Sequence, residues 1–127
     1  MKTIKVGILG LGTVGSGVYE LLCKNGDFIS AKSGVIIKVE KAADTNTKRK
    51  HALGIPEGVF TTAASDIIEN PDIDVVVELI GGTTVAKKLM LQAIRNGKHI
   101  VTANKALLAT HGREIFEEVL KSKVELG

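Results

Sequence analysis

The chain has 127 residues, with 44% hydrophobic and 24% charged residues, proportions near the globular average that exclude a disordered segment. A net charge of +3 and an aromatic content of 3% provide neither a strong attraction for polyanions nor enough rings on which bases could stack, so we expect no nucleic-acid partner. No apolar run is long enough to cross a bilayer, and a single cysteine cannot form an internal disulfide, so we expect a cytoplasmic protein with no membrane partner.

The first half of the chain alternates apolar strands with a helical pattern. In chain order we predict a strand at residues 2–9, a glycine-rich turn, a helix from about Thr13 to Asn25-Gly26, and a strand at residues 35–43. We predict a polar loop at residues 27–33 and no regular structure in the basic stretch 45–54. Because Cys23 follows Leu21 and Leu22 in the predicted helix, we expect it to be a packed core thiol.

The second half continues the alternation up to the last residues. In chain order we predict a strand at 59–61, a helix at 64–69 capped near Thr62, a strand at 72–79, a helix at 84–95, a strand at 98–102, a helix from about 106 to 121 broken at Gly112, and a strand beginning at 124–126. Such an alternation predicts the α/β class, with a doubly wound parallel sheet and right-handed crossovers. We expect the strand order 3-2-1-4-5-6.

A glycine-rich turn, Gly10-Leu11-Gly12-Thr13-Val14-Gly15, joins the first predicted strand to the first helix. In that setting Gly10 permits the tight turn, Gly12 lets a pyrophosphate approach the backbone, and Gly15 allows the helix to pack closely on the strand. The free N–H groups at the helix start then face the phosphates. The sequence therefore predicts one Rossmann-type dinucleotide-binding domain over residues 1–127, the alternative being an ordinary turn without a ligand.

Residues after the second strand bear on the choice between NAD and NADP. Asp44 ends that strand, where an acid accepts hydrogen bonds from the adenosine ribose and favours NAD. Lys48 and Arg49 follow closely, and basic residues there can hold the 2′-phosphate of NADP. A solvated basic loop is the alternative for this pair. The cofactor is therefore expected to be NADP or NAD, and the choice stays open.

Two further segments lie at the carboxyl ends of predicted strands, where ligands bind in open α/β sheets. The segment Glu78-Leu79-Ile80-Gly81-Gly82 has a double glycine that suggests backbone close to a ligand, although it could be an ordinary flexible turn. The segment Thr102-Ala103-Asn104-Lys105 puts Lys105 on the same rim as the glycine turn, where a lysine can polarise a carbonyl or exchange a proton. From composition alone, a surface lysine is the more frequent outcome. The three histidines have no metal-ligand spacing, so we expect no metal site.

Three stretches of the chain resemble the homoserine dehydrogenase family, and the resemblance extends from Lys2 to Leu126. The similar stretches are residues 6–17 (VGILGLGTVGSG), 72–82 (DIDVVVELIGG) and 97–108 (GKHIVTANKALL). The last two together are far more specific than the glycine turn. Members of that family interconvert aspartate semialdehyde and homoserine with NAD(P)H, a step in the synthesis of threonine, methionine and isoleucine.

The resemblance implies roles for individual residues. Lys105 matches a lysine that is catalytic and contacts the cofactor, and we expect cofactor contacts from Thr102 and Asn104 in the same segment. The pyrophosphate is held by the residues matched by Gly10, Gly12, Thr13, Val14 and Gly15. The nicotinamide lies near the turn matched by Gly81, Gly82 and Thr83.

Family members continue into a substrate-binding and dimerisation domain, which these residues do not contain. The resemblance therefore implies a fragment that binds the dinucleotide but needs the missing domain for its substrate, within a full-length enzyme that forms a homodimer. Two alternatives remain. One is another oxidoreductase of the same architecture, such as an aspartate dehydrogenase, which the segment Thr102-Ala103-Asn104-Lys105 disfavours. The other is a nucleotide-binding module that senses redox state without catalysing a reaction.

Overall fold

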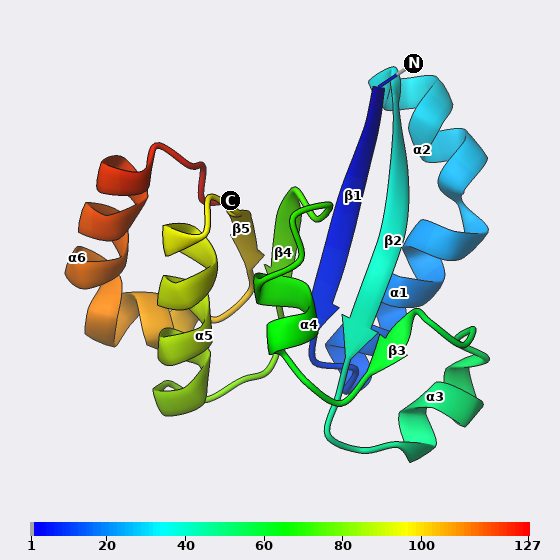
Figure 1. The fold of residues 1–127 in the computed structure, drawn as a ribbon, viewed down its shortest axis with the longest axis horizontal. Helices are drawn as coiled ribbons and strands as arrows, with labels where there is room; N and C mark the ends of the chain where they lie inside the picture. Colours follow the sequence, from blue (N-terminus) through cyan, green and yellow to red (C-terminus); the bar gives the residue numbers. More distant parts are fainter. Residues whose placement is uncertain (1) are drawn as a thin grey trace.

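Five parallel strands form the centre of the computed structural model, which describes residues 2–127 (Figure 1). The strands are β1 (Lys2–Leu9), β2 (Val35–Ala43), β3 (Phe60–Thr61), β4 (Val75–Glu78) and β5 (His99–Thr102). The helices are α1 (Thr13–Lys24), α2 (Gly26–Ser33), α3 (Lys48–Leu53), α4 (Ser65–Ile68), α5 (Thr84–Arg95) and α6 (Lys105–Ser122). The sheet order is β3-β2-β1-β4-β5, and a parallel bridge between Ile100 and Leu126 begins a further strand beside β5. This arrangement confirms the predicted fold class and strand order.

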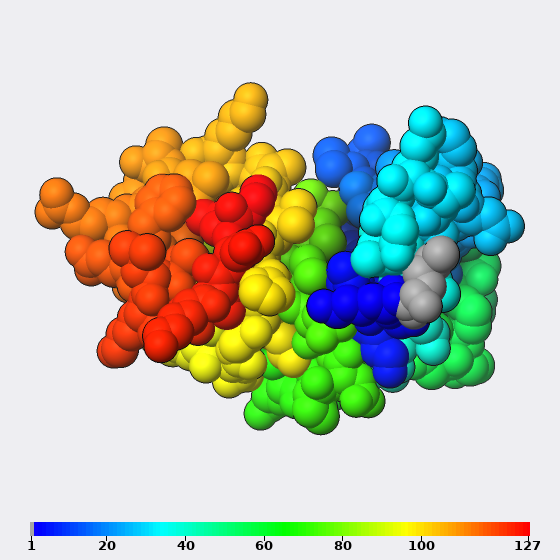
Figure 2. All heavy atoms as spheres, turned by 90° about the horizontal axis from the view of Figure 1, so that it is seen from above, coloured from blue at the N-terminus to red at the C-terminus, as the bar shows by residue number. Residues whose placement is uncertain are grey.

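The core is divided between the two faces of the sheet because successive strand residues point to opposite sides. Val6 and Ile8 of β1 pack with Tyr19 of α1 on one face, whereas Leu9 packs with α4 and α5 residues on the other. Neighbouring residues of β4 divide in the same way, with Val77 on the first face and Val76 on the second. Figure 2 shows the first strands and helices gathered on one side of the molecule, the last ones on the other, and the β4 region between them. Both faces of the sheet therefore carry helices, although the first face is open over β5, where Val101 is 45% exposed.

The strand order reverses at β1, which pairs with β2 on one edge and with β4 on the other. Beyond the end of β1, the Gly10 N–H donates to the Ala43 carbonyl at 2.9 Å, and the Leu79 N–H donates to the Leu9 carbonyl at 2.8 Å. The turns that follow β1, β2 and β4 are thereby held together at one rim. This reversal is the place where open α/β sheets form a ligand crevice.

Two segments without a predicted helix are helical. Residues 27–33 belong to α2 rather than to a polar loop, because the segment packs on β2 and ends at Gly34, whose left-handed φ of 75° closes the helix. The basic stretch contains α3, which ends in the same way at Gly54. The predicted cap near Thr62 is also wrong, since α4 begins after Ala64 and no side chain among residues 2–127 caps it.

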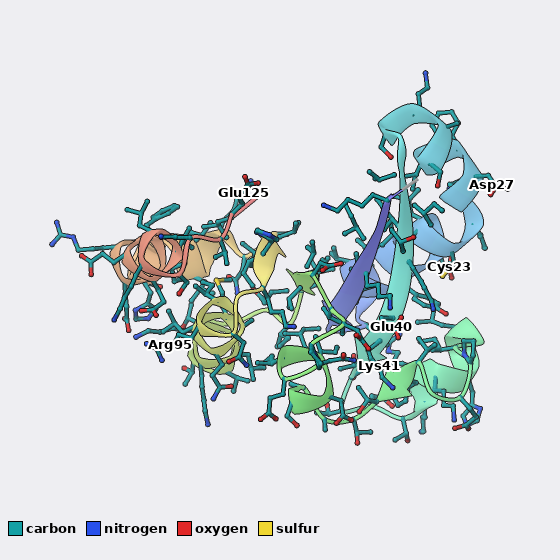
Figure 3. All side chains as sticks on the ribbon, turned by 45° about the horizontal axis from the view of Figure 1, so that its top comes forward. Cys23, Asp27, Glu40, Lys41, Arg95 and Glu125 are labelled. Carbon is teal, nitrogen blue, oxygen red and sulfur yellow. The ribbon has the colours of Figure 1, made fainter. Side chains whose placement is uncertain are left out.

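Cys23 is exposed, so the prediction of a core thiol is wrong. Cys23 lies one helical turn beyond the buried Tyr19, at the C-terminal end of α1, where its side chain is exposed. Leu21 is exposed as well. Figure 3 shows Cys23 at the outer edge of the molecule. Burial raises the pKa of Tyr19 to about 12, and a hydrogen bond with Cys23 adds to that increase.

The long helix α6 is kinked, as predicted, but the residue with non-helical dihedrals is His111 rather than Gly112. At its start, the Asn104 side chain accepts a hydrogen bond from the Leu107 N–H at 3.0 Å and caps the helix. The α5 helix begins and ends where the sequence predicts. Within residues 2–127, no helix has the length and apolarity needed to cross a membrane.

Candidate functional site

The glycine turn is held by contacts that leave no room for side chains at two of its positions. Gly10 has a φ of 100°, and a Cβ there would lie 2.8 Å from the Leu79 carbonyl oxygen. A Cβ at Gly15 would lie 1.8 Å from the Gly10 carbonyl oxygen, well inside any van der Waals distance. The predicted roles of these two glycines, a tight turn and close helix packing, agree with this geometry.

Gly12 differs from these two because it has open space in front of it. Within the part of the chain that the structure describes, nothing lies within 4 Å of a Cβ built at Gly12. Gly12 also precedes α1 as its cap residue, and among residues 2–127 no side chain bonds the first amide groups of the helix. Those N–H groups and the helix dipole therefore face an open surface, which fits the pyrophosphate of a dinucleotide.

The Asp44 carboxylate ties the glycine turn to the loop after β2. One carboxylate oxygen accepts from the Leu11 N–H at 2.8 Å, and the other accepts from the Asn46 N–H at 2.8 Å. Each oxygen has a second lone pair, so the carboxylate can still accept from a ribose hydroxyl. Asp44 lines a cavity of about 320 Å³ with Gly10 and Gly12, on the β2 side of the turn.

A second cavity, of about 340 Å³, lies on the other side of the glycine turn. It is lined by Val14, Glu78, Leu79, Gly81, Ala103, Asn104, Lys105 and Ala106. Val14 is an apolar residue that is 58% exposed, and it lies beside Lys105, which is also exposed. Leu79 lines both cavities, so the two adjoin across the end of β4. Together they can hold the two halves of an extended ligand whose centre crosses the start of α1.

Glu78 is fully buried at the end of β4, and its carboxylate has two neutral hydrogen-bond partners. The Ile80 N–H donates to Oε2 at 2.8 Å, and the Thr102 hydroxyl donates to Oε1 at 2.9 Å. Through these bonds the turn after β4 and the end of β5 share one side chain. Since both partners donate, the carboxylate serves as the acceptor for both.

The network continues from Thr102 into the start of α6. The Asn104 N–H donates to the Thr102 hydroxyl oxygen at 3.0 Å, and the Asn104 side-chain nitrogen donates to the Gly82 carbonyl at 2.6 Å. Asn104, the residue before Lys105, thus connects the double-glycine turn with Thr102 at the end of β5. Both glycines of that turn have positive φ, 83° at Gly81 and 73° at Gly82, so the turn depends on glycine at both positions.

Half of the predicted site residues line the two cavities at the rim, and the other half do not. The rim residues that line the two cavities are Gly10, Gly12, Asp44, Val14, Gly81, Asn104 and Lys105. The residues that line neither cavity are Thr13, Gly15, Lys48, Arg49, Gly82, Thr83 and Thr102. Glu78 and Leu79 also line these cavities; the sequence placed both in a segment near a ligand but indicated no role for either side chain, although an acid that ends the apolar run Val75–Val77 was a visible signal.

Another groove, of about 520 Å³, lies between α4 and α5 and is lined by residues such as Lys88, Gln92 and Arg95. It contains no residue of either glycine-rich turn and lacks the open helix start, so the rim is the better candidate for the site. Within residues 2–127, no group of three or more acidic, histidine or cysteine side chains is placed to hold a metal ion.

Comparison with known proteins identifies the family. The family model described as "Homoserine dehydrogenase, NAD binding domain" matches residues 10–126. The chain is 48% identical over 124 residues to a homoserine dehydrogenase of Pseudomonas aeruginosa, covering 98% of this chain and 28% of the relative. It is 39% identical over 126 residues to that of Bacillus subtilis, covering 99% of this chain and 29% of the relative.

A crystal structure of a homoserine dehydrogenase from Thiobacillus denitrificans has a closely similar fold, with a TM-score of 0.90 and 47% sequence identity. The match covers 99% of this chain and 29% of that one, so this chain spans less than a third of the length of its relatives. The family match over residues 10–126 and the glycine turn at the strand reversal lead to one conclusion: the chain belongs to the NAD-binding domain family of homoserine dehydrogenase, and its cofactor is a nicotinamide dinucleotide.

Proposed function

We propose that the chain is the cofactor-binding part of an enzyme that interconverts L-aspartate 4-semialdehyde and L-homoserine with NAD(P)H. The observation that carries this proposal is the position of Lys105, which lines one cavity with Val14 of the glycine turn and Gly81 of the double-glycine turn. A lysine at that place can reach both the reacting end of a bound dinucleotide and a substrate carbonyl. The family membership supports this assignment over an aspartate dehydrogenase or a redox sensor without activity.

We assign the two cavities to the two halves of the cofactor. The cavity that contains Asp44 takes the adenosine half, because the acid there can accept from the ribose hydroxyls. The open N–H groups after Gly12 take the pyrophosphate, and Thr13 and Gly15 contribute through their backbone. The cavity that contains Lys105 then takes the nicotinamide half.

When bound, the reduced nicotinamide supplies a hydride for the aldehyde carbon of aspartate semialdehyde. The contribution of this chain is the Lys105 ammonium, which can stabilise or protonate the alkoxide oxygen that forms at the former carbonyl. The exposed apolar surface of Val14 lies beside it and suits a planar aromatic ring.

Substrate binding and dimerisation are assigned to parts of the enzyme beyond this chain. More than two thirds of the length of the relatives lies outside the matched segment. We propose that residues of such a part complete the substrate site and form the homodimer, and that this chain alone binds cofactor but turns over substrate very slowly.

The pair of substitutions Gly12→Ala and Gly17→Ala tests cofactor binding by this chain. Both positions have open space for a methyl group, so both variants should fold with unchanged urea midpoints or slightly higher ones. Only Gly12 lies where the pyrophosphate must approach the backbone, so we expect Gly12→Ala to weaken NADH and NADPH binding by at least about tenfold, measured by calorimetry. Equal binding by the two variants would contradict the assignment of the pyrophosphate to this turn.

A further inference from the structure

We propose that Glu78 is a positioning residue for the nicotinamide half of the cofactor, acting through the Ile80–Gly82 turn and the Thr102–Lys105 segment. The inference rests on the proposed function, since it concerns the same rim. Glu78 is neither a residue of the glycine turn nor the proposed catalytic lysine, yet its carboxylate links the two segments that line the second cavity.

The burial of Glu78 indicates a specific role. A carboxylate with 0% exposed surface at the end of a strand loses its hydration, which is unfavourable unless hydrogen bonds replace it. An apolar residue would continue the run Val75–Val77 without that loss. Within residues 2–127, Glu78 forms no ion pair. Its two hydrogen-bond donors are neutral groups, the Ile80 N–H and the Thr102 hydroxyl.

These two donors belong to the two segments that must be aligned. The Ile80 N–H begins the double-glycine turn. Its two glycines have positive φ and carry no side chains that could hold the turn in place. The Thr102 hydroxyl leads through the Asn104 N–H to the start of α6, where Lys105 follows. Glu78 therefore fixes the distance between the double-glycine turn and Lys105.

Asn104 closes the network on the side nearer to solvent. Its side chain donates to the Gly82 carbonyl and accepts from the Leu107 N–H, so the turn and the helix are joined a second time. With both connections made, Gly81 and Lys105, which both line the cavity, are held as one unit. A network whose donors and acceptors are all matched is more rigid than its separate bonds.

The substitution Glu78→Gln breaks this matching with little change in shape. A glutamine amide has one carbonyl oxygen, so either the Ile80 N–H or the Thr102 hydroxyl faces an NH₂ group and loses its acceptor. Of the residues bonded to Glu78, only Ile80 lines the adenosine cavity and Thr102 does not, so most ligand contacts there should stay intact.

The test compares two ligands, NADH and ADP-ribose, which lacks the nicotinamide ring. For Glu78→Gln we expect NADH affinity to fall by about tenfold and ADP-ribose affinity to stay within about twofold, measured by calorimetry on the same chain. Thr102→Val should reproduce this pattern, and the double variant should lose little more than either single variant because all three break one network. Thr102→Ser keeps the hydroxyl and should bind NADH almost as the unmodified chain does.

The control is Glu118→Gln, which alters a carboxylate that accepts from Arg95 between α5 and α6, away from both cavities. It should leave both ligand affinities unchanged. Equal losses of NADH and ADP-ribose in Glu78→Gln would show a general structural role and overturn the inference, as would an unchanged affinity for NADH. If the unmodified chain binds neither ligand, the proposed function fails and the inference fails with it.

Discussion

The role proposed for Lys105 depends on the residues that surround it. On its own it is an exposed lysine at a helix start. The structure puts it, with its chain neighbour Asn104, beside Val14 and Gly81, which come from two other segments of the chain. Its chemistry therefore follows from the meeting of β4 and β5 at the rim.

For Lys105→Ala in a full-length enzyme that contains this domain, we predict a loss of turnover of roughly 10²–10⁴-fold, the usual size of an acid–base contribution. Cofactor affinity should fall far less, because we assign the pyrophosphate to the glycine turn and the α1 N-terminus rather than to Lys105. Steady-state homoserine oxidation and cofactor titration on the same variant measure both. The exposed Lys121 at the other end of α6 provides the control, with Lys121→Ala expected to retain full activity. A loss below about threefold for Lys105→Ala would remove the catalytic role.

The sequence was informative at the residues whose backbone geometry admits few alternatives. Gly10 and Gly15 could be given roles in advance because a side chain at either position collides with the backbone. Glu78 and Leu79 could not, since their roles depend on partners that are distant in sequence, such as Thr102 and Leu9. A strand pattern shows which residues are buried, but not what a buried carboxylate will bond.

At the scale of elements, the strands and the long helices followed from periodicity, whereas α2 did not. The α2 segment has an aspartate and two serines but no buried residue, so no apolar stripe is present to predict it. Two hydrogen bonds close the C-terminal end of α2. The Gly34 N–H donates to the Ser30 carbonyl at 3.0 Å, and the Ser33 hydroxyl donates to the Ile29 carbonyl at 2.7 Å. The contact with β2, by contrast, forms only when the chain folds, and the α2 sequence alone does not reveal it.

The α3 helix bears on cofactor choice because it places Lys48 and Arg49 directly after the loop that Asp44 organises. We predict that Arg49→Glu weakens NADPH binding by about tenfold and NADH binding by less than about threefold, since only NADPH has a 2′-phosphate for the guanidinium. Calorimetry with both cofactors measures the difference. Lys32→Glu makes the same change in net charge on α2 and should affect the two cofactors equally. Equal losses for both cofactors with Arg49→Glu would show that Arg49 does not read the phosphate.

At the scale of the whole molecule, the buried Lys98 connects the segment that leads into β5 with the segment that leads into β4. Lys98 is 5% exposed, and its ammonium donates to the Ile73 carbonyl at 2.8 Å and to the Asn70 carbonyl. We predict that Lys98→Met lowers the free energy of unfolding by about 1–3 kcal/mol, because one buried and one partly buried carbonyl group lose their partner. Urea unfolding measures this value, and Lys88→Met, on an exposed lysine of α5, should change it by less than about 0.5 kcal/mol.

The stability difference between the unmodified chain and Lys98→Met should depend on pH. Burial lowers the pKa of Lys98 below its ordinary value of 10.5, although Asp74 and Asp72 partly oppose that effect. Between the two pKa values the unfolded chain binds more protons at this site than the folded chain, so the stabilising contribution of Lys98 rises with pH. The stability difference between the unmodified chain and Lys98→Met should therefore be larger at pH 10 than at pH 8. A smaller difference at pH 10 would contradict the assignment of the shift to burial.

The pairing of β1 along both of its edges has a consequence for the order in which the molecule can assemble. One edge meets β2, which follows soon in the chain, but the Lys5 N–H bonds the Asp74 carboxylate across a separation of 69 residues. A nascent chain therefore keeps an unpaired, apolar edge of β1 until β4 has been made, and contacts at such separations form slowly. Both cavities contain residues that follow β4, so neither exists before that slow step. We therefore expect a bound dinucleotide to slow the unfolding of the finished molecule and to leave the folding rate unchanged.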